Sequence, residues 1–117
     1  MTQPAPPKNE DILACARRVL AIEGSALEAL SARLGDEFAR AVRLILDSPG
    51  RVIVSGLGKS GHIARKIAAT MASTGTPAYF VHAAEALHGD LGMIHRDDVL
   101  IALSNSGETA ELLAVVP

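Results

Sequence analysis

An apolar segment that runs directly into a glycine-rich turn is the strongest constraint on how this chain can fold. Residues 51–55 read Arg-Val-Ile-Val-Ser and are followed at once by Gly56-Leu-Gly-Lys-Ser-Gly61. A β-branched run that does not alternate with polar residues predicts a strand buried on both faces. The glycines allow a sharp turn and close approach to a ligand, and the N–H groups that start a following helix attract anions. We therefore expect a parallel sheet with an anion site at the end of this strand.

Helical and extended patterns alternate along the rest of the chain. Isoleucine and methionine recur every four residues after the turn, and short apolar runs follow at two later places. The predicted elements are a helix over 60–73, a strand over 76–82, an irregular stretch over 83–95, a strand over 98–103 and a helix from Gly107 onward. Strands that alternate with crossover segments build a parallel sheet, so the predicted fold class is α/β.

The first fifty residues are expected to lie outside this alternation. Three prolines within the first seven residues predict a disordered lead over 1–9. Apolar residues at helical spacing then predict two helices within 10–49, the first extending to about Leu34 with a possible interruption at Gly24, the second ending at Ser48. Their apolar stripes could cover the sheet or contact a partner subunit, and the sequence leaves both open.

The domain that begins near residue 50 is expected to continue beyond residue 117. Three strands and a short last helix would leave a sheet edge and apolar faces uncovered. Residues 50–117 are therefore interpreted as the first half of a domain that is truncated after its third strand.

Composition excludes several classes of partner. Eleven Lys and Arg against 13 Asp and Glu give a net charge of −2, which provides no basic field for nucleic acid or an anionic membrane. The single cysteine, Cys15, cannot form an intrachain disulfide, and no leader or membrane-spanning run is present. These features predict a cytoplasmic protein.

The first turn admits more than one interpretation. A nucleotide P-loop would need a glycine where Ile53 stands, so that motif fails. The spacing of Gly56, Gly58 and Gly61 matches the dinucleotide fingerprint, but the acidic residue expected at the end of the second strand is replaced by His82. An ordinary tight turn capped by Ser60 is the structural alternative.

A second polar turn follows the third predicted strand and favours a phosphate ligand. Residues 104–109 read Ser-Asn-Ser-Gly-Glu-Thr, which offers three hydroxyls and the N–H groups of a helix start. Helix capping by Ser106 and Thr109 is the alternative function of these hydroxyls. If the first and third strands are neighbours, both turns emerge side by side at the carboxyl edge of the sheet.

The two turns and the residues between them resemble the sugar isomerase (SIS) domain. That domain is a flavodoxin-like parallel sheet with helices on both faces, a three-layer sandwich. The string GLGKSGHIARKIAATMASTGTPAYFVHAAEALHGDLGMI is similar to the arabinose 5-phosphate isomerases within this family. The resemblance implies interconversion of D-arabinose 5-phosphate and D-ribulose 5-phosphate, which supplies the octulosonate sugar of lipopolysaccharide. It also implies a homo-oligomer, a tetramer in the family, with a pentose 5-phosphate as its small-molecule partner.

The resemblance implies a catalytic set, and the turns supply the binding residues. The implied catalytic residues are Lys59, His88 and Glu111, with Glu108 as a nearby alternative to Glu111. The predicted phosphate ligands are Ser104, Asn105, Ser106, Gly107 and Thr109. The remaining predicted substrate contacts are Ser55, Gly56, Gly58, Ser60 and Gly61. A further glutamate and histidine, two more strands and, in longer members, paired CBS modules would lie beyond residue 117, so these 117 residues alone are expected to be inactive.

Isomerisation of an aldose to a ketose proceeds through an enediol and needs a base and a group that stabilises an oxyanion. No metal or redox cofactor is required, so none is predicted. His82, Glu85 and His88 could hold a metal ion incidentally, although their spacing matches no metal motif. Two other functions stay open, a non-catalytic SIS module that senses sugar phosphates and a dinucleotide-binding domain.

Overall fold

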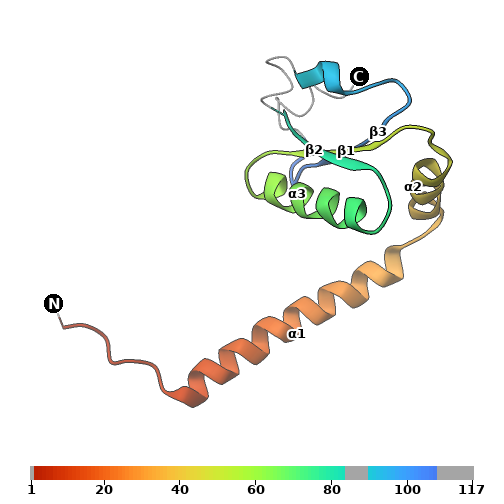
Figure 1. The fold of residues 1–117 in the computed structure, drawn as a ribbon. Coiled ribbons are helices and arrows are strands. Elements are labelled where there is room, and N and C mark those ends of the chain that lie inside the picture. The colour runs from red at the N-terminus through yellow and green to blue at the C-terminus, as the bar shows by residue number, and fades with distance from the viewer. Residues whose placement is uncertain (1, 84–89, 108–117) are drawn as a thin grey trace. The chain divides into compact units, whose positions relative to one another are not determined.

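The computed structural model describes residues 2–83 and 90–107 (Figure 1). It divides into two compact units, Met1–Arg40 and Ala41–Pro117. The predicted helix from Gly107 onward falls almost entirely on residues 108–117, outside the described part of the chain. Among the described residues, no helix has both the length and the apolar character needed to cross a bilayer. The predicted boundary near residue 50 stays a prediction.

The two N-terminal helices form where the apolar spacing predicted them. Helix α1 spans Asn9–Arg33 without an interruption at Gly24, and α2 spans Asp36–Asp47. Acidic side chains occupy the first turn of each helix, where they interact favourably with the helix dipole. Within its own unit α1 buries none of its residues, since it has no neighbouring element to pack against.

The second unit is built on a parallel sheet of three short strands. These are β1 (Val52–Gly56), β2 (Ala78–His82) and β3 (Val99–Leu103), in the order β2-β1-β3. Val52 is level with Ala78 on one side and with Val99 on the other. All five residues of the central strand are buried, as its unbroken apolar run predicted. The predicted α/β class and parallel sheet are confirmed.

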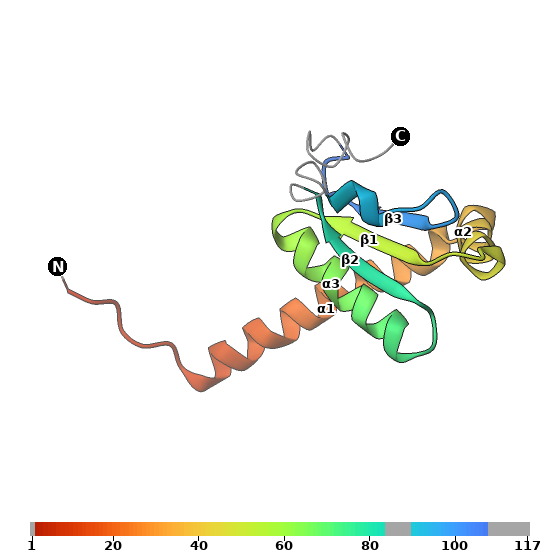
Figure 2. The same cartoon turned by 45° about the horizontal axis from the view of Figure 1, so that its top comes forward.

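Helix α3 (Gly58–Ser73) covers one face of this sheet, as Figure 2 shows. Its alanines Ala64 and Ala68 are buried against Val52 and Val54 of the central strand. Small side chains at these positions let the helix axis lie close to the strand, which keeps this part of the core free of large voids. Ile45 of α2 packs against the same cluster.

The opposite face carries a second apolar cluster and the short 3-10 helix η1 (Asp90–Met93), as seen in Figure 1. Ile53, Val81 and Ala83 form the buried cluster, and Ile94, which follows η1, packs against it. The two faces of β1 are thus covered by different segments. Because both faces of the sheet are covered, the polar turns lie at the carboxyl ends of the strands.

Candidate functional site

The carboxyl ends of the three strands are level with one another. Gly56, the last residue of β1, is opposite His82 of β2 and opposite Leu103 of β3. The chain leaves β1 toward one side of the sheet to form β2 and later returns to the other side to form β3. Ligands of open parallel sheets bind where the strand order reverses in this way. The first and third strands are neighbours, which is the condition under which the two turns were expected to emerge side by side, so both polar turns begin at adjacent strand ends.

The three glycines of the first turn serve two different structural roles, a left-handed backbone conformation and a close approach of backbone to backbone. Gly58 has φ of +55°, a left-handed conformation that disfavours residues with a side chain. Gly56 and Gly61 instead allow close approach, because a Cβ on Gly61 would lie 3.1 Å from the Gly56 carbonyl oxygen. The Gly61 N–H donates to the Leu57 carbonyl at 3.1 Å, which closes the turn. The result is a helix whose first residues lie directly beyond the end of the central strand.

Among the described residues, no side-chain hydrogen bond caps the start of α3, whose N-cap residue is Leu57. The alternative in which Ser60 serves as the cap is therefore not observed. Uncapped N–H groups at a helix N-terminus carry a partial positive charge that suits an anionic ligand. Lys59 lies exposed in this first turn and Ser60 is half-buried. A cation at this position opposes the helix dipole, and a bound phosphorylated ligand would offset that repulsion.

The second turn is closed by one of its own hydroxyls. Gly107 has φ of +72°, and its N–H donates to Ser104 Oγ at 2.9 Å. A hydroxyl oxygen that accepts a hydrogen bond still has a proton to donate, so this bond is compatible with a phosphate contact by Ser104. Asn105 and Ser106 are exposed at the tip of the turn. Helix capping by Ser106 and Thr109 stays a prediction, because Thr109 lies outside the described residues.

Ser55 lies one residue before the first turn and differs from the other predicted contacts. Its side chain is fully buried, and its Oγ has no hydrogen-bond partner in the described part of the protein. It is on the same face of β1 as Ile53, because alternate residues of a strand share a face. Its contact with a substrate stays a prediction.

Several predicted residues lie outside the described part of the chain. These are Glu85, His88, Glu108, Thr109 and Glu111. The structure therefore starts the two turns, the first of which contains Lys59, from adjacent strand ends but does not place the other members of the implied catalytic set. Within residues 2–83 and 90–107, no group of histidine, cysteine, aspartate and glutamate side chains could hold a metal ion.

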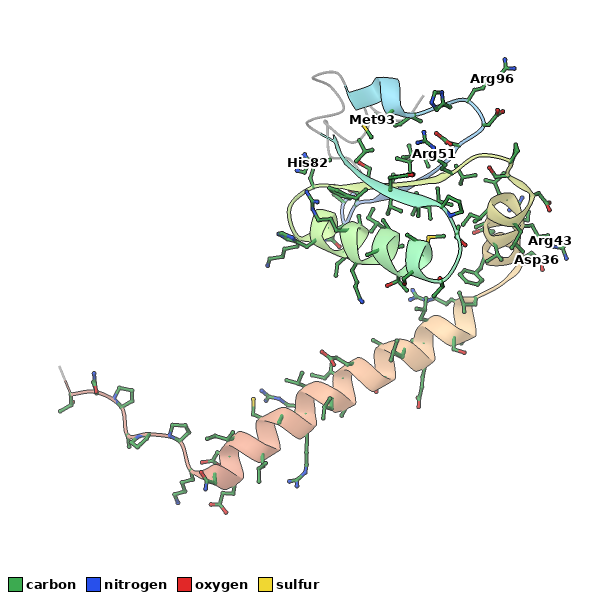
Figure 3. All side chains as sticks on the ribbon, viewed as in Figure 1. Asp36, Arg43, Arg51, His82, Met93 and Arg96 are labelled. Atoms are coloured by element: carbon green, nitrogen blue, oxygen red, sulfur yellow. The ribbon has the colours of Figure 1, made fainter. Side chains whose placement is uncertain are left out.

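The end of β2 bears on the dinucleotide interpretation. His82 closes this strand, with its ring edge-on to Phe80 at a centroid separation of 6.2 Å (Figure 3). A dinucleotide site would need a carboxylate near this position to bind the ribose hydroxyls. The described strand end offers an imidazole instead.

The sequence did not reveal a charged network at the opposite, amino end of the sheet. Arg51 and Asp98 precede β1 and β3 and are joined by an ion pair of 3.1 Å. An unlike charge directly before each of two apolar runs was the available signal. These two charges can be interpreted as an ion pair only once the two strands are known to be neighbours.

Comparison with known proteins places these turns in context. Residues 44–117 match the SIS domain. Arabinose 5-phosphate isomerase KdsD of Pseudomonas aeruginosa PAO1 is 56% identical over 110 residues, which cover 94% of this chain and 34% of that protein. Arabinose 5-phosphate isomerase GutQ of Escherichia coli K12 is 55% identical over 109 residues, covering 93% and 34%. The chain thus spans about a third of the length of these curated relatives.

A solved structure is similar throughout the described elements. The structure of E. coli CFT073 c3406 in complex with A5P superimposes with a TM-score of 0.89 at 49% identity. The match covers 95% of this chain and 59% of that one.

Proposed function

Since the chain belongs to the SIS domain family, we propose that it is part of an enzyme that interconverts D-arabinose 5-phosphate and D-ribulose 5-phosphate. The chain supplies the two polar turns of the active site. The remainder of the catalytic groups comes from residues outside its described part. On this proposal, 117 residues that cover about a third of the isomerases they match are inactive alone.

One observation carries the proposal. The turns after β1 and β3 start from strand ends that are level and adjacent, at the point where the strand order reverses. The second turn offers hydroxyls and N–H groups to a phosphate, and Lys59 belongs to the turn that begins at the neighbouring strand end. A protein that is 49% identical has been crystallised in complex with A5P, which supports the same ligand class here.

The reaction follows from this arrangement. A base removes the proton from C2 of the open-chain aldose while negative charge develops on the C1 oxygen. Protonation of that oxygen gives the enediol; loss of the proton on the C2 hydroxyl and return of a proton to C1 then give the ketose. Lys59 stabilises the developing oxyanion, a task for a preorganised cation in a site that excludes water. His88 and Glu111 remain the proposed proton-transfer groups, and none of these steps needs a metal ion or a redox cofactor.

A dinucleotide site is the second candidate because the glycine geometry of the first turn fits it. Gly58 adopts a left-handed conformation and Gly56 and Gly61 approach each other closely, as a pyrophosphate turn requires. Against it, β2 ends in His82 and β3 leads into a hydroxyl-rich turn that has no standard role in dinucleotide binding. The sugar phosphate therefore remains the better-supported ligand.

The proposal extends to the setting of the whole protein. A phosphorylated pentose is charged and does not cross a membrane unaided, which supports a cytoplasmic location. We also propose a homo-oligomer, supported by the apolar residues that α1 leaves exposed within its own unit, among them Leu20 and Leu27.

The test uses the whole protein incubated with D-arabinose 5-phosphate in D2O and followed by proton NMR. The expected result is formation of ribulose 5-phosphate with deuterium incorporated at C1, because the enediol exchanges its proton with solvent. Binding without turnover in a parallel calorimetric titration would instead support the sugar-phosphate sensor. Binding of NAD with no response to the pentose phosphate would overturn the proposal in favour of the dinucleotide site.

A further inference from the structure

The amino end of the sheet, opposite the two turns, carries a network centred on one guanidinium group. Arg51 directly precedes β1, and Asp98 directly precedes β3. The parallel register that pairs Val52 with Val99 puts these two residues side by side although they are 47 positions apart in the chain. Figure 3 shows Arg51 between the sheet and the segment that contains Met93.

The Asp98 carboxylate is fully engaged. It accepts hydrogen bonds from the Arg51 backbone N–H at 2.8 Å, from Arg51 Nη2 at 3.1 Å and from the His95 backbone N–H at 2.8 Å. Only 2% of its side-chain surface is exposed. The His95 N–H, followed by the Arg51 side chain, lowers the pKa of Asp98 well below its usual range. The carboxylate is therefore charged at any physiological pH and holds all three donors in place.

The Arg51 side chain also contacts two other elements. Its Nη2 donates to the carbonyl oxygen of Met93, the last residue of η1, at 2.6 Å. Its guanidinium carbon lies 5.1 Å from the centre of the Tyr79 ring on β2. One side chain thus joins β2, β3 and the end of η1, with Nη2 bonded to both Met93 and Asp98 and the planar guanidinium group beside the Tyr79 ring.

These contacts fix the far end of the connection between β2 and β3. That connection leaves the carboxyl edge after His82, includes η1, and reaches the amino edge at Asp98. Ile94, one residue beyond the carbonyl that Arg51 binds, packs on the buried cluster of Ile53, Val81 and Ala83. Beyond any contribution of the ion pair to stability, these bonds fix η1 relative to the sheet.

We propose that Arg51 is a positioning residue for the isomerase reaction, holding η1 and the β2–β3 connection in register with the sheet through Met93 and Asp98. The proposal rests on the isomerase function proposed above. The connection starts at the same sheet edge as the two turns, and a shift of η1 would disturb the packing of Ile94 on Val81 and Ala83, which lie at that edge. A displacement of about 1 Å in a catalytic group can reduce turnover as much as 100-fold.

The test compares variants of the whole protein at a temperature well below thermal unfolding. Arg51→Ala is expected to lower kcat by about 10- to 100-fold with less than a threefold change in KM, since the turn at 104–107 that binds phosphate is untouched. Arg51→Lys is expected to recover part of the loss, because a lysine keeps the positive charge but lacks the Nε–H that points at Asp98 and the planar group that lies beside Tyr79. Arg96→Ala, which removes an exposed arginine of the same connection that points away from the sheet in Figure 3, should match the wild type.

Hydrogen exchange distinguishes a failure of the positioning role of Arg51 from a failure of the proposed isomerase function. Amides in residues 90–98 should exchange at least tenfold faster in Arg51→Ala than in the wild type, whether or not the wild type is an isomerase. An inactive wild type with this exchange difference would refute the proposed function but keep the anchoring. A lower melting temperature with unchanged kcat and unchanged exchange would overturn the positioning role, and if Arg51→Ala does not fold, Arg51→Lys carries the same comparison.

Discussion

Substitution of Gly58 tests whether the first turn depends on its left-handed backbone. Gly58 has φ of +55°, and a Cβ placed on it would meet no atom within 4 Å. Steric contacts therefore do not complicate the measurement, and the backbone conformation alone decides the cost. A left-handed conformation costs a residue with a side chain about 1 to 2 kcal/mol.

Part of this cost is offset in the unfolded state. Alanine restricts the unfolded chain more than glycine does, which returns about 0.4 to 1 kcal/mol. Gly58→Ala should thus destabilise the domain by about 1 kcal/mol, Gly58→Asn by less, because asparagine tolerates this conformation, and Gly58→Val by about 2 kcal/mol or more. The control is Gly24→Ala in α1, where the backbone is helical and no atom lies within 4 Å of the added Cβ. That change should stabilise the helix by about 0.5 to 1 kcal/mol.

The measurement is denaturant unfolding of the whole protein, with hydrogen exchange of α3 and β1 peptides to localise the effect to the domain that contains the turn. The wild type is expected to be the most stable, followed by the asparagine, alanine and valine variants in that order. Calorimetry with D-arabinose 5-phosphate should show weaker binding in the same order, since a relaxed turn redirects its N–H groups. An alanine variant as stable as the wild type, or a valine variant more stable than the asparagine one, would refute the reasoning.

Three further predictions follow from the site and the network. Lys59→Ala should lower kcat by about 100- to 1,000-fold, as for loss of one preorganised oxyanion donor, whereas Lys66→Ala, two turns along the same helix, should not; equal losses would contradict the assigned role. Asp98 has a lowered pKa, so its stabilising effect is complete above the unfolded value of about 3.9 and is lost progressively as the pH falls below it. The difference in melting temperature between wild type and Asp98→Asn should therefore stay constant from pH 6 to pH 5 and shrink from pH 4 to pH 2. Ser55→Ala should raise the free energy of unfolding by about 1 kcal/mol, because the buried Ser55 hydroxyl has no hydrogen-bond partner among the described residues. A lower free energy of unfolding, measured with urea, would show that the hydroxyl does have such a partner.

The fold could be predicted from the sequence where a single local pattern decided the structure. The apolar run of β1 and the helical spacing within α1 and α3 gave elements whose bounds differ from the observed ones by one or two residues. The predicted strand began at Arg51 but the observed one begins at Val52. The difference has a physical cause, since the Arg51 N–H is bonded to the Asp98 side chain instead of to a neighbouring strand.

The site could be predicted only in part. The two turns were evident because glycine and hydroxyl residues after an apolar run have few other uses. To predict that the two turns are adjacent, one must know the strand order, which depends on long-range pairing. The sequence suggested adjacent turns only on the condition that the first and third strands are neighbours. The contacts of Arg51 with Met93 and Tyr79 could not be anticipated, because they join three segments that no local pattern relates.

The position of β3 on the free edge of β1 also has a consequence for how the protein is made. β1 and β2 are joined by one short helix, so they can pair soon after they leave the ribosome. The β1–β3 pair must wait for a segment that lies 47 positions further along the chain, counted from Arg51 to Asp98, and it closes a longer loop at a higher entropic cost. A nascent chain that ends before residue 99 would present the first turn without the second. The two turns would therefore come together only when the third strand docks.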